Sequence, residues 1–347
     1  MSRVAVVLVN WNGWKDTVEC LESLFRLDDR EIRVIVCDNA SSDGSVERVK
    51  AWANGLAAAS CDAPATLRPL VLPPVAKPIP FAELDRTTAE VGGDPDCDPP
   101  LIIIRTGGNL GFAGGNNVGL RYLLARGGFD FAWLLNNDTV VDPASLGHLV
   151  AEFSSRPQLG ICGSTLLCYD DPSRIQALGG GYYCRWIGLP WLHGRWRRMK
   201  PRHLQAKAAP FLMNYVVGAS MLVSREFIER VGLMAEDYFL FFEETDWAWR
   251  GRGRFALGWA PRSLVYHKIG RSIGTSTDPR RKSATCDYYA LRNRLLFTRR
   301  FCKVALPTVW LSLLGALLIR ILSGRRDLVG PVWKLLTGRQ GLPPVGR

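Results

Sequence analysis

The chain has 347 residues, an apolar content of 47% and a formal net charge of +12. This length and apolar content allow one large or two modest globular domains, which excludes a disordered or fibrous protein. The positive charge indicates a negatively charged partner such as nucleic acid, an anionic membrane surface or an anionic small molecule. Because no basic run is interleaved with aromatic residues, we expect no nucleic-acid partner.

The cysteines and the amino terminus favour the cytoplasm. Nine cysteines are scattered without a C-x-x-C pair, which argues against a zinc ribbon or a redox pair. An odd number without framework spacing fits a reducing compartment. A strand pattern begins directly after Met1-Ser2-Arg3, which leaves no room for a signal peptide.

Short apolar runs alternate with helical patterns in the amino-terminal part. The runs of strand length are 4–9, 32–37, 101–104 and 131–135, and 117–125 is helix-like. Strands that are apolar throughout and alternate with helices predict an α/β, Rossmann-like fold with a mainly parallel sheet flanked by helices. Ligands of such sheets bind beyond the carboxyl ends of the strands.

Further along, the composition changes. Residues 55–100 are rich in Ala, Pro and Asp with little periodicity, which predicts a mobile or disordered surface insertion without a catalytic role. Hairpin-like signals start at residue 159, and a helical pattern covers 283–300. We therefore expect one domain over 1–300 and a separate apolar and basic segment over 301–347.

The segment 304–322 is strongly apolar, and arginines lie near its end at 320 and after it at 325 and 326. Its length is borderline for a membrane span, and a proline and a glycine interrupt it. We favour a helix on the inner face of the cytoplasmic membrane, held by these arginines. A full span and a terminal helix packed on the domain are the alternatives.

The strand 131–135 ends on Asn136, Asn137 and Asp138. Asp142 followed by Pro143 predicts a helix N-cap with proline at the first helical position. That explains Asp142 but leaves Asp138 without a structural reason.

Two other strand ends are polar. Glycines and asparagines fill 105–120, RTGGNLGFAGGNNVGL, before a helix. Glycines allow a close backbone approach and a helix N-terminus attracts anionic oxygens, although a glycine-rich turn without a ligand explains the segment equally well. Asp38 ends the second strand, where an acid accepts nucleotide hydroxyl or base N–H groups or closes an Asx turn.

The densest acidic cluster, YFLFFEETDWAWRGR, contains Glu243, Glu244, Asp246 and Trp247. Acids in a first helical turn favour the helix dipole. A carboxylate against aromatic surface has a raised proton affinity, which suits a general base. Later, His267 follows a strand and precedes Lys268 and Arg271, a pattern that favours a metal and phosphate site.

The sequence resembles family 2 inverting glycosyltransferases of GT-A fold, in particular bacterial rhamnosyltransferase-like members. The resemblance runs from Val4 to about Arg300 apart from the insertion, and the matching segments occur in the order typical of the family. The matching segments are VVLVNWNG, VIVCDNASSDGS, NLGFAGGNN, LLNNDT, GASMLVSREFIERVG, YFLFFEETDW and HKIGRS.

The resemblance implies a nucleotide-diphosphate sugar donor, Mg²⁺ or Mn²⁺ bound through oxygens, and direct attack by an acceptor hydroxyl. It puts Asn136, Asn137 and Asp138 at the family's DXD-type position, with Asp138 as the carboxylate on the metal. Asn136 stands where many members have the first Asp, so that the metal is expected to bind weakly or through water. His267 matches a position that completes the metal shell in some relatives.

The same resemblance assigns roles to the other candidates. Glu244 is the base, Asp246 is the second candidate, and Glu243 and Trp247 contact the acceptor. The expected donor-site residues are Val9, Asn10, Asp38, Asn109, Gly111, Asn116, Asn137, Lys268 and Arg271.

The leading hypothesis is the transfer of rhamnose from dTDP-rhamnose, with inversion, to a glycan or polyprenyl-linked acceptor in cell-surface polysaccharide synthesis. A galactofuranosyl or UDP-hexose transferase would use the same motifs. A nucleotidyltransferase is less favoured, because it would carry a basic glycine-rich signature near the amino terminus. A non-catalytic membrane scaffold is the third class.

Overall fold

The computed structural model describes residues 2–29, 31–59, 62–206, 212–268, 283–324 and 326–337. Within them lies a ten-stranded sheet with the order β3-β4-β2-β1-β5-β12-β7-β13-β6, and β8 pairs with β7. Its strands are β1 Val4–Asn10, β2 Ile32–Asp38, β3 Phe81–Asp85, β4 Leu101–Arg105, β5 Phe131–Asn136, β6 Thr139–Val141, β7 Leu159–Cys168, β8 Ile175–Leu178, β12 Ser220–Ser224 and β13 Ala256–His267.

The half of the sheet from β3 to β5 is parallel throughout, which confirms the predicted architecture. Asn10 pairs with Asp38 across β1 and β2, and Val9 pairs with Asn136 across β1 and β5. The polar strand ends therefore lie along one edge of the sheet, where such folds bind ligands.

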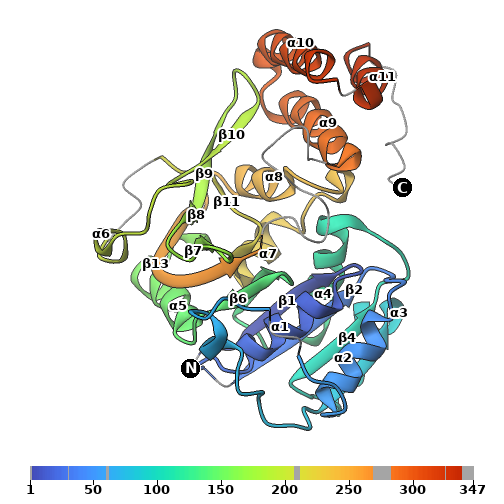
Figure 1. Cartoon of the computed structure of the whole chain (residues 1–347), viewed down its shortest axis with the longest axis vertical. Helices are drawn as coiled ribbons and strands as arrows, with labels where there is room; N and C mark the ends of the chain where they lie inside the picture. Colours follow the sequence, from blue (N-terminus) through green and yellow to red (C-terminus); the bar gives the residue numbers. More distant parts are fainter. Residues whose placement is uncertain are drawn as a thin grey trace.

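Helices cover both faces of the sheet (Figure 1). They are α1 Trp14–Leu24, α2 Ser45–Ala53, α3 Arg86–Glu90, α4 Gly111–Arg126, α5 Ser145–Ser155, α6 Pro201–Leu204, α7 Arg225–Val231, α8 Glu243–Arg250, α9 Ala284–Phe301, α10 Leu306–Leu322 and α11 Arg326–Leu336, with 3₁₀ turns η1 Arg68–Leu70, η2 Glu236–Tyr238 and η3 Lys303–Ala305.

Successive side chains of β1 point to opposite faces of the sheet, so they pack on different sets of helices. Val6 and Leu8 belong to the core that includes α1 and α5, whereas Ala5 and Val7 belong to the core that includes α4, α7 and α8. Gly119 brings α4 close to the sheet, because a Cβ there would lie 2.7 Å from Val7 Cγ1.

The described part of the segment 55–100 is ordered and packs on the fold, although the sequence predicted a disordered or surface insertion. Its strand β3 extends the sheet beside β4. The buried Glu22 of α1 accepts hydrogen bonds from Trp52 Nε1 and from the Val75 backbone, both at 2.8 Å. A buried carboxylate with these partners fixes the segment in a way that composition does not reveal.

The predicted helix start at Asp142 is also wrong, because α5 begins at Ser145. The Asp142 carboxylate accepts from the Ala144 backbone at 3.1 Å and so closes a turn. The Pro143 carbonyl accepts from Asp28 N at 3.1 Å and is therefore not available to a helix.

A smaller sheet of β10 Leu189–Leu192, β9 Gly180–Cys184 and β11 Tyr215–Val216 rises from the main sheet toward α10 (Figure 1). At the β9–β10 turn, the Ile187 carbonyl accepts from Ser312 Oγ of α10 at 2.8 Å. Helix α10 also packs on α9, where Arg320 forms a buried ion pair with Asp287. Arg320 is thus not a surface anchor of the kind predicted.

Candidate active site

The strand ends of β1, β2 and β5 form one hydrogen-bonded network. Asn10 Nδ2 donates to Asp38 Oδ1 at 2.7 Å, and the second Asp38 oxygen accepts from Ser41 N at 3.0 Å. Asn137 Nδ2 donates to Asn10 Oδ1 at 3.2 Å and to Thr17 Oγ1 at 2.9 Å. The structure therefore brings together Asn10, Asp38 and Asn137, three of the residues expected to contact the donor.

Val9 lies beside this network. Its side chain packs on α4, because a Cβ on Gly115 would lie 2.7 Å from Val9 Cγ1. The Val9 side chain thus packs on α4 and remains partly exposed at the sheet edge.

A second group joins Asp138 to His267, which lies at the end of β13. Asp138 Oδ1 is 3.0 Å from His267 Nε2, and the Asn136 amide reaches the same nitrogen at 3.3 Å. His267 Nδ1 lies 2.9 Å from Gln176 Oε1 on β8. Burial alone would raise the pKa of Asp138, but His267 and Lys268 hold it below its ordinary value.

This group has the chemistry of a divalent metal site. With the present amide orientation, Gln176 accepts the Nδ1 hydrogen, so that a neutral His267 would turn its Nε2 lone pair toward the Asp138 carboxylate. Two lone pairs at this distance repel unless a proton or a metal ion lies between them. A hydrogen bond that orients a metal-binding histidine in this way is common.

The donor set of this site is small. Within the described part of the chain, no group of three or more His, Cys, Asp or Glu residues is placed to hold a metal. Asp138 and His267, with the oxygen of Asn136, would therefore leave coordination positions for ligand oxygens, which is the usual arrangement of Mg²⁺ beside phosphates.

Lys268 is occupied by other groups. The Lys268 side chain is 4% exposed, and its ammonium forms ion pairs with Asp16 and Glu19 of α1. Burial would lower the pKa of Lys268, but Glu19 and Asp16 raise it above its ordinary value. An ammonium neutralised by two carboxylates is a poor partner for phosphate, so this prediction is not supported. Arg271 lies outside the described residues.

The glycine-rich segment has a mixed outcome. Asn109 is exposed, and its Oδ1 accepts from Gly111 N at 3.1 Å in an Asx turn. Asn116 is buried, and its Oδ1 has no hydrogen-bond partner among the described residues. A buried amide oxygen without a partner is costly, which supports a ligand at Asn116.

Glu243 and Glu244 open α8 with unpartnered oxygens. Oε2 of each is buried and has no hydrogen-bond partner among the described residues. Burial raises the pKa of Glu244 to about 7. Burial and the charge of Glu244 raise the pKa of Glu243 well above its ordinary range. A carboxylate whose pKa lies near neutral pH, as that of Glu244 does, suits a base.

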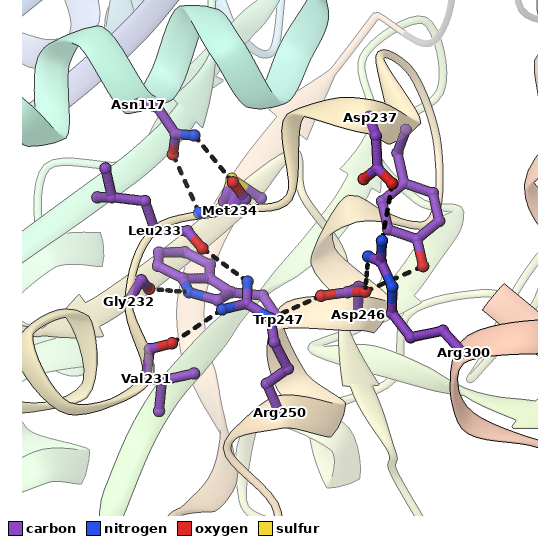
Figure 2. Close-up of polar contacts among 11 residues, drawn as sticks. Asn117, Val231, Gly232, Leu233, Met234, Asp237, Asp246, Trp247, Arg250 and Arg300 are labelled. Carbon is purple, nitrogen blue, oxygen red and sulfur yellow. Dashed lines mark hydrogen bonds and ion pairs between the residues drawn. The ribbon is translucent and has the colours of Figure 1, made fainter. Parts of the chain in front are cut away.

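Asp246 and Trp247 have structural contacts instead (Figure 2). Asp246 is fully buried and accepts from Arg250 Nε at 2.7 Å, Arg300 at 2.7 Å and the Tyr238 hydroxyl at 3.0 Å. Trp247 is also fully buried, and its Nε1 donates to Gly232 O at 2.7 Å. The predicted acceptor contact by Trp247 is therefore wrong, and Asp246 has no free oxygen for the role of a base.

The family model of Glycosyl transferase family 2 matches residues 5–60 and 85–232, which is more than half of the chain. This chain is a family 2 glycosyltransferase. The match covers the Asp38 network and Asp138, and it ends before Glu244 and His267.

Among curated proteins, this glycosyltransferase is similar to the low-salt glycan biosynthesis hexosyltransferase Agl10 of Haloferax volcanii. The two are 25% identical over 230 residues, which are 64% of this chain and 70% of that protein.

Two solved structures share its fold. The mannosyltransferase PcManGT from Pyrobaculum calidifontis, in complex with GDP-Man and Mn²⁺, has a TM-score of 0.51 and 14% identity, with 97% of this chain and 86% of that chain covered. GalNAc-T7 with UDP, GalNAc and Mn²⁺ has a TM-score of 0.51 and 15% identity, with 86% and 48% covered. The chain thus spans about half of the GalNAc-T7 chain, and under two thirds of Staphylococcus aureus TarS 1-349.

The sequence alone did not reveal two residues that position side chains of the candidate active site. Gln176 orients His267, and Asn293 of α9 contacts the turn before Glu243. Neither lies in a recognisable motif for its role, because each is more than 50 residues away in the sequence from the group that it contacts. An isolated polar residue within an apolar stretch is the single signal that marks Gln176.

Proposed function

We propose that this glycosyltransferase moves a sugar from a nucleotide-diphosphate donor to an acceptor hydroxyl with inversion, and that Glu244 is the base. The observation that carries the proposal is the buried, unpartnered Oε2 of Glu244, whose pKa is raised to about 7 by burial. A carboxylate with this proton affinity accepts a hydroxyl proton efficiently near neutral pH.

The reaction is a single displacement. Glu244 takes the proton of the acceptor hydroxyl while the acceptor oxygen forms a bond to the anomeric carbon. The bond from that carbon to the diphosphate oxygen breaks, and the nucleoside diphosphate leaves with the electron pair. Asp38 and Asn10 hold the nucleoside at the sheet edge. Asn109, Gly111 and Asn116, at the start of α4, line the sugar side of the donor.

A divalent ion, Mg²⁺ or Mn²⁺, would be held by Asp138, His267 and Asn136, and would neutralise the charge on the leaving diphosphate. The Mn²⁺ named with the mannosyltransferase and GalNAc-T7 structures supports this part of the proposal. Gln176 keeps His267 in the tautomer that offers its Nε2 lone pair.

The donor we propose is dTDP-rhamnose, on the resemblance of the seven motifs to rhamnosyltransferase-like proteins. The second candidate is a UDP- or GDP-hexose, which the hexosyltransferase and mannosyltransferase relatives favour. The test is a panel of dTDP-, UDP- and GDP-sugars with Mg²⁺ or Mn²⁺, with release of nucleoside diphosphate as the readout. Release of pyrophosphate instead would indicate a nucleotidyltransferase, and failure to bind any nucleotide would favour a scaffold.

The acceptor that we propose is a glycan or polyprenyl-linked sugar at the cytoplasmic membrane surface. Helix α10 would hold the enzyme at that surface. Lys303–Leu322 is long and apolar enough to cross a membrane, but 28% of its apolar window is buried in the fold. One face packs on α9 through Leu313, Leu317 and Arg320, and Arg320 is paired with Asp287. These contacts favour a helix lying on the membrane over one that spans it.

The opposite face of α10 is apolar and exposed. Its exposed large side chains are Trp310, Leu311, Leu318, Ile319, Ile321 and Leu322. The exposed Trp186 and Arg185 of the β9–β10 turn lie next to it, since Thr308 Oγ1 donates to the Trp186 carbonyl. Tryptophan and a cationic side chain beside an apolar helix face are typical of a membrane interface.

Vesicle sedimentation tests this part of the proposal. We expect the full-length chain to bind vesicles of phosphatidylglycerol and phosphatidylcholine, and the double variant Leu311→Glu and Leu318→Glu to lose most of that binding. Leu56→Glu, another exposed leucine outside α10, is the matched control. Equal binding by both variants would show that α10 does not contact lipid.

A further inference from the structure

The turn before α8 has an unusual backbone. Phe239, Phe241 and Phe242 have φ values of 62°, 69° and 77°. Bulky residues rarely adopt this left-handed conformation, and it persists only where the surrounding structure imposes it. Because Phe242 is followed directly by Glu243 and Glu244, whatever holds this turn also sets the place of both carboxylates.

One support is the peptide group that joins Gly111 to Phe112. Its N–H, on Phe112, donates to Phe239 O at 2.8 Å, and its carbonyl, on Gly111, accepts from Asn39 Nδ2 at 2.9 Å. A Cβ on Gly111 would lie 2.2 Å from Phe239 O. Gly111 is therefore required for the close approach of the turn, a structural role in addition to the donor contact proposed for it.

The second support is Asn293 of α9, whose side chain is fully buried. Its Nδ2 lies 2.9, 2.8 and 2.9 Å from the carbonyl oxygens of Tyr238, Leu240 and Phe241. Its Oδ1 accepts from Arg292 at 2.8 Å. Three carbonyls surround one amide nitrogen, so that only a donor fits at this position.

We propose that Asn293 is a positioning residue for the transfer reaction: it holds the left-handed turn 239–242 and thereby fixes the carboxylate of Glu244. It acts through Glu244, and the inference rests on the proposed function in so far as Glu244 is the base. The Gly111–Phe112 peptide holds the same turn from the donor side and so links the position of the base to the Asn39 loop.

Hydrogen–deuterium exchange of the full-length chain tests the holding role without any substrate. Asn293→Ala should speed exchange in peptides covering 238–246 and leave β1, β2 and β5 unchanged. Asn117→Ala is the matched control, because Asn117 is a buried asparagine bonded to Met234 N and O just upstream (Figure 2). Should Asn293→Ala fail to fold, Asn293→Ser, which keeps one donor, replaces it. Unchanged exchange over 238–246 would overturn the proposal.

Turnover with the donor found in the nucleotide-sugar panel tests the catalytic consequence. We expect Asn293→Ala to lower kcat by about 10²-fold, since misplacement of a reacting group by about 1 Å has that effect. The KM for the donor should change little, because the Asn293 amide nitrogen donates to carbonyls of 238–241 and not to the Asp38 network. A change in KM alone would overturn the role, as would an Asn117→Ala variant that loses kcat equally.

A comparison of two substitutions at Phe241 separates backbone strain from lost packing. In the Asn293→Ala background, Phe241→Gly and Phe241→Ala both remove the ring, but only glycine adopts a positive φ freely. Glycine should restore kcat about tenfold relative to alanine. Equal kcat for the two would overturn the strain argument. If no donor gives turnover in the unmodified chain, the proposed function and the catalytic consequence fail together, while exchange still decides the holding role.

Discussion

The two acidic regions of the active site differ in how their charges are satisfied. At the ends of β1 and β2, Asp38 accepts from Asn10 and Ser41, and the positive φ values in the loops that follow are at the small residues Asn12 and Ala40. At the start of α8, Glu243 and Glu244 keep buried oxygens without partners among the described residues, and the preceding turn is left-handed at three phenylalanines. Each phenylalanine held at a positive φ lowers the stability of the fold by about 1–3 kcal/mol.

This difference indicates two kinds of site. The Asp38 carboxylate already has its hydrogen-bond partners before any ligand arrives, which suits recognition of a nucleoside. The Glu244 region is held in an unfavourable state by Asn293, Gly111 and the Asp246 ion pairs. Rules of local stability are broken mainly at functional sites, so the unsatisfied region is the better candidate for chemistry.

The largest expected effect comes from removal of the base. Glu244→Gln keeps the size of the side chain but cannot accept the proton, so turnover should fall by about 10²–10⁴-fold. Donor binding, measured by calorimetry with the nucleoside diphosphate, should be unchanged because the Asp38 network is intact. Glu243→Gln is the neighbouring comparison, and a larger loss there would move the base to Glu243.

The next effect concerns folding. Asp246→Ala should lower the free energy of unfolding by about 3 kcal/mol, since it leaves two arginines beside a buried gap. Asp237→Ala removes an exposed partner of the same Arg300, and its effect should be under about 1 kcal/mol. Urea unfolding measures both. Equal effects would show that Asp246 is not the main support of α8.

Loss of Gln176, which acts on the metal group through His267, gives a smaller change. Gln176→Ala should weaken Mn²⁺ affinity by about 10–100-fold, because His267 loses the group that fixes its tautomer. Titration with Mn²⁺ in the presence of nucleoside diphosphate measures this, and Asp138→Ala should abolish metal-dependent turnover. Gln158→Ala, at an exposed glutamine, is the control. Metal affinity that is unaffected by Asp138→Ala would exclude the site.

The smallest effect is the dependence on pH. With the pKa of Glu244 near 7, kcat/KM should fall about tenfold for each pH unit below that value, because the base is then protonated.

Protonation of Glu243 and Glu244 also stabilises the fold. Both acids have raised pKa values in the folded state, so their contribution is full below about pH 4.5 and is lost as the pH rises through the folded-state pKa of each acid, which is about 7 for Glu244. Glu244→Gln should flatten both profiles, and an unchanged rate profile would contradict the assignment.

The sequence by itself determined the parallel strands and their polar ends. Hydrophobic runs of strand length, each closed by a polar residue, are local features, and parallel pairing brings their ends to one edge. Asn10, Asp38 and Asn137 were therefore predictable as neighbours. The order of the motifs indicated the family, and the family model confirmed it.

Only the tertiary structure decided what each acid and cation does. Asp246 is neutralised by Arg300, which lies 54 residues away in the sequence, and Lys268 by Asp16 and Glu19 on the first helix. Trp247 is in the core because α8 presents it to Phe227. The charge state and exposure of these side chains depend on partners that distant segments supply, and desolvation arises only when those segments pack together. Local sequence therefore identified the acidic cluster, and packing separated its unpartnered carboxylates from its structural one.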